Sequence, residues 1–277
     1  MKRFWTCLSV VVLLVLVGVA FAAEAKGAKD GVLKIGCVSD IEGAIDNARL
    51  AAQSLQKQGV DMVIVAGDVY ENEQRRKHPR YPDSTDNAQE MFDGLQPFAE
   101  LGVPVYVIPG NHEERDVYRQ GLAMLQQQYP QVIDVNGKAV DAGGAHLVGL
   151  GGYYLKNFIP DDGFLTNATS YAAAEQQLKN FRAEAPVIFV THSPPLGRSK
   201  IDLVEGVGHV GDANITRILS GTSVFHVCGH IHEGGGTFEQ FNRSTSYNAA
   251  SITPYMNPDA PRTTVFIVNK TIVPAGR

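Results

Sequence analysis

The stretch Ser223–His232, with the sequence SVFHVCGHIH, places two histidines directly after a short apolar run. The apolar run predicts a buried strand, and residues two apart at a strand end point to the same face. Gly229, just before the pair, allows a tight turn beside whatever the two imidazoles hold. Taken alone, the pair is weak support for a metal site, because a surface turn can also carry two solvated histidines.

Four similar polar clusters lie upstream, and each of them follows an apolar run. Five groups of ligand-type side chains at predicted strand ends indicate one shared metal site better than five coincidences do. Strand ends are also where α/β sheets bind their ligands. The upstream clusters are Ser39-Asp40-Ile41-Glu42-Gly43, Gly67-Asp68, Gly110-Asn111-His112-Glu113 and Thr191-His192-Ser193.

Apolar periodicity predicts the elements between the clusters. In the first half, strands are expected over 32–38, 62–66 and 103–108, and helices over 41–55 and 86–101. In the second half, strands are expected over 132–134, 145–150, 186–190 and 223–228, and a helix over 169–182 capped by Thr169 or Ser170. After His232, short antiparallel strands are expected over 236–241, 246–249, 263–268 and 271–273, the last two joined at Asn269-Lys270. One α/β domain with two sheets and helices outside accommodates all of them.

Length and composition limit the classes of function. The chain has 277 residues, 44% of them hydrophobic, which suffices for one large domain with a real core. The formal charge is −5 and no stripe of basic residues is present, so no stable nucleic-acid complex is expected. The basic cluster Arg75-Arg76-Lys77 lies in a loop that we expect to be solvated. Cys37 and Cys228 lie inside apolar runs and are expected to be buried free thiols.

Residues 1–25 have the pattern of a secretory signal peptide. Lys2 and Arg3 form a charged start, the apolar run Cys7–Phe21 follows, and small residues lead to a cleavage site as late as Ala25. An uncleaved anchor is the alternative, but this run is shorter than the roughly 20 residues that a spanning helix needs. We therefore expect a mature domain over 26–277 that is periplasmic or secreted and has no membrane span.

The order of the five clusters resembles that of the calcineurin-like metallophosphoesterase superfamily, particularly its compact prokaryotic members. The resemblance runs from about Lys34 to Ala250, and its most specific part is Gly-Asn-His-Glu combined with Gly-His-x-His. It implies a four-layer αββα sandwich of two mixed sheets with flanking helices. It also implies a metal-dependent phosphoric ester hydrolase, in which a hydroxide bridging two divalent ions attacks a small phosphate mono- or diester.

The family's functional residues can be matched to this chain motif by motif. The match gives His112 the role of assisting the leaving group, as a general acid or as an imidazolium that stabilises charge. Nitrogen and oxygen ligands without thiolate suit Mn, Fe, Ni or Zn, and we expect Mn. The implied ligands are Asp40 and His232 for metal one, Asn111, His192 and His230 for metal two, and Asp68 between them, with Asn111 also contacting substrate.

Glu42 departs from the family pattern, which has histidine at this position. Its carboxylate either ligates metal one, favouring harder ions such as Mn or Mg, or points elsewhere and leaves that metal to water. Two other features stay open. His209 either contacts substrate or is structural, and the aromatic loop 153–167 either lines a substrate cleft or caps the core. His226 is expected in the core.

Two other kinds of function compete with a hydrolase. A non-catalytic module that binds metal or phosphate on the same scaffold is compatible with the unusual Glu42. A structural zinc protein is disfavoured, because the ligands are spread over five strand ends and none is cysteine. The presence of His112 favours the enzyme, since a binder needs no general acid. The sequence leaves the choice of ester, the metal and the oligomeric state open.

Overall fold

The computed structural model describes residues 32–71, 87–181, 185–250 and 264–269. Three sequence predictions fall outside these ranges: the signal peptide over 1–25, the solvated loop around Arg75-Arg76-Lys77 and the strand over 271–273. No helix in the described part of the chain is both long and apolar enough to cross a membrane.

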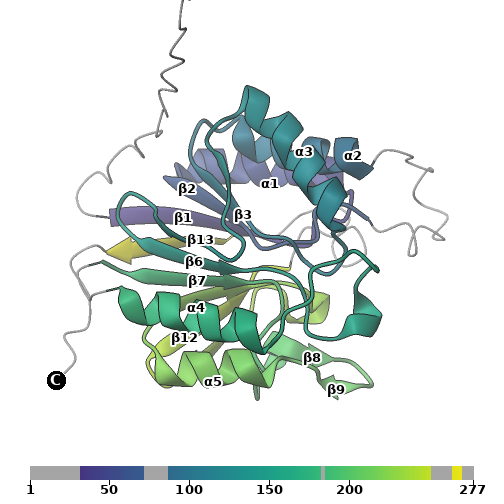
Figure 1. The fold of residues 1–277 in the computed structure, drawn as a ribbon. Helices are drawn as coiled ribbons and strands as arrows, with labels where there is room; N and C mark the ends of the chain where they lie inside the picture. The colour runs from purple at the N-terminus through teal and green to yellow at the C-terminus, as the bar shows by residue number, and fades with distance from the viewer. Residues whose placement is uncertain (1–31, 72–86, 182–184, 251–263, 270–277) are drawn as a thin grey trace, which may run out of the picture.

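Two large sheets stack face to face at the centre of the molecule (Figure 1). Both are parallel in the middle and antiparallel at an edge, so both are mixed, as predicted. The first has the order β13 (Thr264–Asn269), β1 (Val32–Val38), β2 (Met62–Val65), β3 (Val105–Val107) and β4 (Val132–Asp134). The second has the order β11 (Phe238–Phe241), β12 (Ser244–Asn248), β10 (Phe225–Cys228), β7 (Val187–Thr191), β6 (His146–Leu150) and β5 (Ala139–Asp141).

Helices cover the outer face of each sheet and complete four layers, so the predicted αββα sandwich is confirmed (Figure 1). The first sheet carries α1 (Ile45–Gln58), α2 (Asn87–Ala99) and α3 (Arg115–Gln128). The second carries α4 (Ala168–Asn180) and α5 (Ala213–Gly221). A small hairpin of β8 (Leu203–Val204) and β9 (Gly208–His209) precedes α5 in the chain.

Alternation along the strands assigns side chains to the layers. In β2, Met62 and Ile64 pack between the two sheets, whereas Val63 and Val65 pack against the helices. This follows from the two-residue period of a strand, and both faces are apolar because both are covered. A sheet buried on both faces is held in one orientation, which fixes where its strand ends lie.

The predicted thiols are confirmed as free and buried. Cys37 packs between the sheets, and Cys228 ends β10. Burial raises the pKa of both thiols above the ordinary value, because the thiolate would lose its hydration. Both cysteines therefore serve as small apolar core residues.

Three details of the sequence prediction were wrong. The first helix begins at Ile45, not near residue 41, because Glu42 and Gly43 have left-handed φ angles of 46° and 72°, which no α-helix accommodates. The cap of α4 is Asn167, whose side chain accepts hydrogen bonds from the backbone of Thr169 and Ser170. The C-terminal strands are not all antiparallel neighbours, since β12 lies parallel to β10 and β13 joins the first sheet beside β1.

Candidate metal centre

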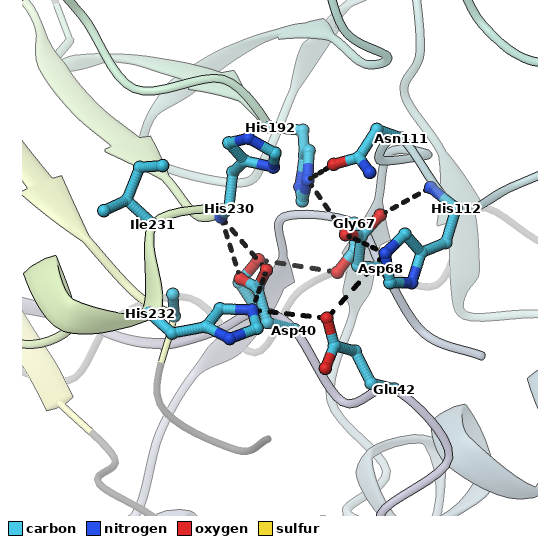
Figure 2. A network of polar contacts seen from close by, with 12 residues as sticks. Asp40, Glu42, Gly67, Asp68, Asn111, His112, His192, His230, Ile231 and His232 are labelled. Carbon is cyan, nitrogen blue, oxygen red and sulfur yellow. Dashed lines mark hydrogen bonds and ion pairs between the residues drawn. The ribbon is translucent and has the colours of Figure 1, made fainter. Parts of the chain in front are cut away.

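The predicted ligand residues follow the carboxyl ends of parallel strands from both sheets. Parallel strands end at the same edge of a sheet, and the two stacked sheets present these edges on one side of the molecule. Figure 2 shows that the side chains converge there. Asp40 and Glu42 follow β1, Asp68 follows β2, Asn111 and His112 follow β3, His192 follows β7, and His230 and His232 follow β10.

The backbone is strained at four residues of the site. Five described non-glycine residues have a positive φ, and four of them are site residues: Asp40 (58°), Glu42 (46°), Asp68 (51°) and His230 (71°). Such conformations cost on the order of 1–3 kcal/mol each and persist only when the surroundings hold them. Here backbone hydrogen bonds do so, from Asp40 N to Gly67 O at 3.1 Å and from Glu42 N to Asp68 O at 3.0 Å.

Two glycines allow backbone to approach the carboxylates closely. A Cβ atom on Gly110 would overlap the carboxylate of Asp68, and one on Gly229 would lie 2.5 Å from Oδ2 of Asp40. The backbone N–H of His230 instead donates to both oxygens of Asp40, at 3.1 and 3.0 Å. Glycine at these positions is therefore a requirement of the site.

One group of ligand atoms belongs to Asp68, His192 and His230, and these atoms lie within 4.8 Å of one another. Nδ1 of His192 lies 2.8 Å from the carbonyl oxygen of Ala66, which can only accept, so Nδ1 carries a proton and Nε2 faces the site. Nε2 lies 2.9 Å from Oδ1 of Asn111 and 3.2 Å from Oδ2 of Asp68. Nε2 of His192 thus faces two oxygen atoms of the site.

The imidazoles of this group have opposite electrostatics. Burial lowers the pKa of His192, but the Asp68 carboxylate outweighs it and raises that pKa to about 9. Burial and the neighbouring charge of His192 lower the pKa of His230 to about 3. Burial also opposes ionisation of Asp68, yet His112 and His192 keep its pKa well below the usual range. The site therefore attracts positive charge without permitting every histidine to be protonated.

A second group consists of Asp40, Glu42 and His232, again within 4.8 Å. Nε2 of His232 lies 3.3 Å from Oδ1 of Asp40 and 3.2 Å from Oε1 of Glu42. Burial lowers the pKa of His232, but these two carboxylates outweigh it and raise it to about 11. Burial raises the pKa of Glu42, but His232 and His112 outweigh it and lower that pKa below its ordinary value. The Glu42 carboxylate thus points into the site.

His112 lies beside one carboxylate from each of the two groups. Its backbone N–H donates to Oδ1 of Asp68 at 2.9 Å. Its Nε2 lies 3.5 Å from Oδ2 of Asp68 and 3.9 Å from Oε1 of Glu42. Glu42, Asp68 and His112 form a third group of possible ligand atoms, so proximity alone permits His112 to act as a ligand or as an acid.

Glu113 has a role that sequence reasoning missed. Its carboxylate accepts hydrogen bonds from the backbone N–H groups of Asp68 (3.1 Å), Val69 (2.7 Å) and Gly110 (2.6 Å). Burial and the charge of Asp68 raise its pKa to about 8. Glu113 therefore joins the loops that carry Asp68 and Asn111, and its place in the Gly110–Glu113 cluster was the available signal.

Two further histidines lie apart from the ligand groups. Nδ1 of His209 lies 2.8 Å from the buried carboxylate of Asp202, and His209 belongs to none of the three groups. His226 is buried as expected, with Nε2 2.9 Å from the hydroxyl of Thr191 and Nδ1 2.7 Å from that of Ser246. Burial lowers its pKa to about 3.

Comparisons with known proteins identify a family and a fold. A family model described as calcineurin-like phosphoesterase matches residues 33–234. The crystal structure of a protein from Thermus thermophilus matches with a TM-score of 0.61 and 14% identity, covering 86% of this chain and 99% of that one. A dimetal phosphatase from Danio rerio matches with a TM-score of 0.57 and 13% identity, covering 79% and 87%. None of the curated proteins matches the chain. Because these sequence identities are low, the two matches show a shared fold and nothing further.

Proposed function

We propose that this chain, which belongs to the calcineurin-like phosphoesterase family, hydrolyses small phosphate esters with two divalent metal ions. The observation that carries the proposal is the pair of ligand groups, Asp68-His192-His230 and Asp40-Glu42-His232, with His112 beside them. The dimetal phosphatase from Danio rerio, which has the same fold, supports the same conclusion.

The donor atoms fit such ions. Asn111 donates through Nδ2 to the carbonyl oxygen of Phe158 at 3.2 Å, so its Oδ1 is the atom that faces His192. Carboxylate oxygens, an amide oxygen and imidazole nitrogens without thiolate suit Mn, Fe, Ni or Zn, and we propose Mn. Asp40, Glu42 and His232 would hold one ion, and Asn111, His192 and His230 the other, with Asp68 between them.

Two such ions would supply an acidified water as the nucleophile and would neutralise charge that develops on the phosphate oxygens. His112 would donate a proton or a hydrogen bond to the departing alcohol oxygen, because its Nε2 lies beside the Asp68 carboxylate at the proposed metal site. Asp68 fixes His112 through the backbone hydrogen bond, and Glu113 fixes Asp68. The residues around the phosphate are therefore held before substrate arrives.

A reconstitution experiment tests the proposal. Protein purified without chelator and supplied with Mn²⁺ should hydrolyse p-nitrophenyl phosphate, bis(p-nitrophenyl) phosphate or both. A chelator should abolish the rate, and added Mn²⁺ should restore it. Bound metal without turnover of either ester would instead identify a binding module, and failure to bind metal would contradict the proposal.

We also propose that the protein is exported. The support is the charged start, the apolar run Cys7–Phe21 and the small residues up to Ala25. Expression of the whole chain in a Gram-negative bacterium should give periplasmic protein whose N-terminus follows Ala22 or Ala25. Full-length protein retained in the cytoplasm would contradict export.

A further inference from the structure

The segment between Tyr153 and Leu165 is anchored directly beside the candidate metal centre. Just before it, the backbone N–H of Gly152 donates to the carbonyl oxygen of Pro109 at 2.8 Å. Its two ends are joined by hydrogen bonds from Tyr153 N to Phe164 O at 2.9 Å and from Thr166 N to Tyr153 O at 3.0 Å. The segment is therefore a closed loop whose base lies next to the Asn111 turn.

The far part of this loop is also held in place. The backbone N–H of Arg115 donates to Asp162 O at 3.0 Å, and its Nε donates to Gly163 O at 3.2 Å. Phe164 packs edge-on against Tyr118, with ring centroids 5.3 Å apart, and so caps the core. These contacts attach the loop to the start of α3, so it forms a preorganised wall.

Phe158 links this loop to Asn111 and Tyr153. Its carbonyl oxygen accepts the hydrogen bond from Asn111, and its ring lies edge-on to Tyr153 with centroids 6.0 Å apart. Tyr153 is buried, and its ring centroid lies 4.2 Å from that of His230. Phe158 thus contacts the proposed ligand Asn111 directly and is connected to His230 through Tyr153, yet 52% of the residue is exposed.

The exposed apolar side chains of the described residues concentrate on this loop. Three of the seven large exposed hydrophobics are Leu155, Phe158 and Leu165. One exposed apolar side chain needs no explanation, but a rigid apolar wall at a binding site can bury a ligand at little ordering cost. Of the alternatives for this loop, Phe164 therefore fits the core cap and Phe158 fits the substrate wall.

We propose that Phe158 is a specificity-determining residue, and that the protein prefers phosphate esters of aromatic or bulky apolar alcohols. The proposal rests on the proposed function, in which the ions hold the phosphate and His112 assists the departing alcohol. His112 follows Asn111 in the chain, and Asn111 holds the carbonyl of Phe158. The proposal places the departing alcohol on the side of the site where the exposed ring of Phe158 lies.

The test compares two esters whose alcohols differ in size but little in acidity, benzyl phosphate and ethyl phosphate, or their methyl diesters if diesters are hydrolysed. Phe158→Ala should lower the ratio of their kcat/KM values about 3- to 10-fold, mainly through KM for the benzyl ester. Phe158→Leu should show a smaller loss. Phe238→Ala is the matched control, since Phe238 on β11 is 49% exposed and packs on Tyr247; its ratio should not change.

A binding measurement separates this proposal from the proposed function. Calorimetry on the Mn²⁺-loaded protein should show that Phe158→Ala weakens the binding of phenylphosphonate about 3- to 10-fold more than the binding of methylphosphonate. The metal content should not change. An unchanged ratio, an equal loss for both ligands or loss of metal would overturn the role of Phe158. If no ester is hydrolysed, the proposed function fails. The phosphonate affinities alone then decide whether the Phe158 ring contacts the organic group of the ligand.

Discussion

The two sheets contribute different chemistry to the centre. The first supplies the carboxylates of Asp40, Glu42 and Asp68, all in left-handed conformations, whereas the second supplies imidazoles, of which His230 alone has a positive φ. Two of the three ligand groups join residues from both sheets, and the third, which contains His112, lies on the first sheet alone. The two ligand groups that join both sheets therefore depend on the stacking of the sheets, whereas the position of the proposed acid, His112, does not.

The same contrast explains the electrostatics. Carboxylates from the first sheet raise the pKa of His192 to about 9 and that of His232 to about 11, against the effect of burial. Without metal, protons on these rings balance the carboxylates, and a metal ion must displace them. Metal binding should accordingly release protons and weaken as the pH falls.

Asp68→Asn should have the largest effect, because Asp68 adjoins both the cross-sheet group with His192 and the group with His112. We expect loss of both ions and hydrolysis at the background rate, measured by elemental analysis and ester assay. Asp46→Asn, at an exposed position on α1, is the control and should change neither value. Retention of two ions by Asp68→Asn would show that the Asp68 carboxylate is not needed to hold either ion.

His112→Ala should come next, since His112 belongs to the first sheet and not to the cross-sheet groups. We expect kcat to fall about 10²- to 10⁴-fold with both ions retained. The deficit should shrink for esters of acidic phenols, whose leaving groups need little protonation. If His112→Ala instead loses an ion, His112 is a ligand, and the division between metal groups and acid is wrong.

Glu42→Ala should have a selective effect. If Glu42 ligates the ion shared with Asp40 and His232, this variant should lose that ion and keep the one near His192. Glu42→His should retain two ions and shift the preference toward Zn or Ni, because imidazole suits those ions better than carboxylate does. Competition between Mn²⁺ and Zn²⁺ would measure the shift. Unchanged occupancy and rate in Glu42→Ala would make Glu42 a bystander.

The smallest effect should come from His226, a second-sheet histidine outside the centre. Burial lowers its folded-state pKa to about 3, so the unfolded chain binds an extra proton below about pH 6.5. Stability is therefore fully present above that pH and falls toward pH 3, by at most about 1.4 kcal/mol per pH unit. Urea unfolding with chelator at several pH values should show a shallower acid dependence in His226→Gln. Equal slopes would mean that His226 is not held neutral.

The centre was predictable wherever a local pattern carried the information. Apolar runs located β1, β2, β7 and β10, and strand ends follow directly from them. Two helices gave weaker signals and were not predicted. In α3, for example, Tyr118, Leu122 and Leu125 form a narrow apolar stripe among polar residues. In α5, the buried Ile215, Ile218 and Leu219 occupy a short helix.

Long-range features could not be predicted from the sequence. The pairing of β13 with β1 joins Asn269 to Val32, and no local periodicity encodes such a contact. The direction of the Glu42 side chain depends on His232, which is contributed by the other sheet. The exposure of Phe158 depends on hydrogen bonds that anchor its loop to distant segments. In each case the deciding partner is remote in the chain.

The most direct test of a centre built between two sheets is its metal stoichiometry. Elemental analysis of the wild-type protein, reconstituted with Mn²⁺ and freed of excess ion, should give close to two ions per chain. Two ions would agree with one cross-sheet group for each, with Asp68 between them. A value that saturates at zero would contradict the whole centre, and a value of one would contradict the group that contains Glu42.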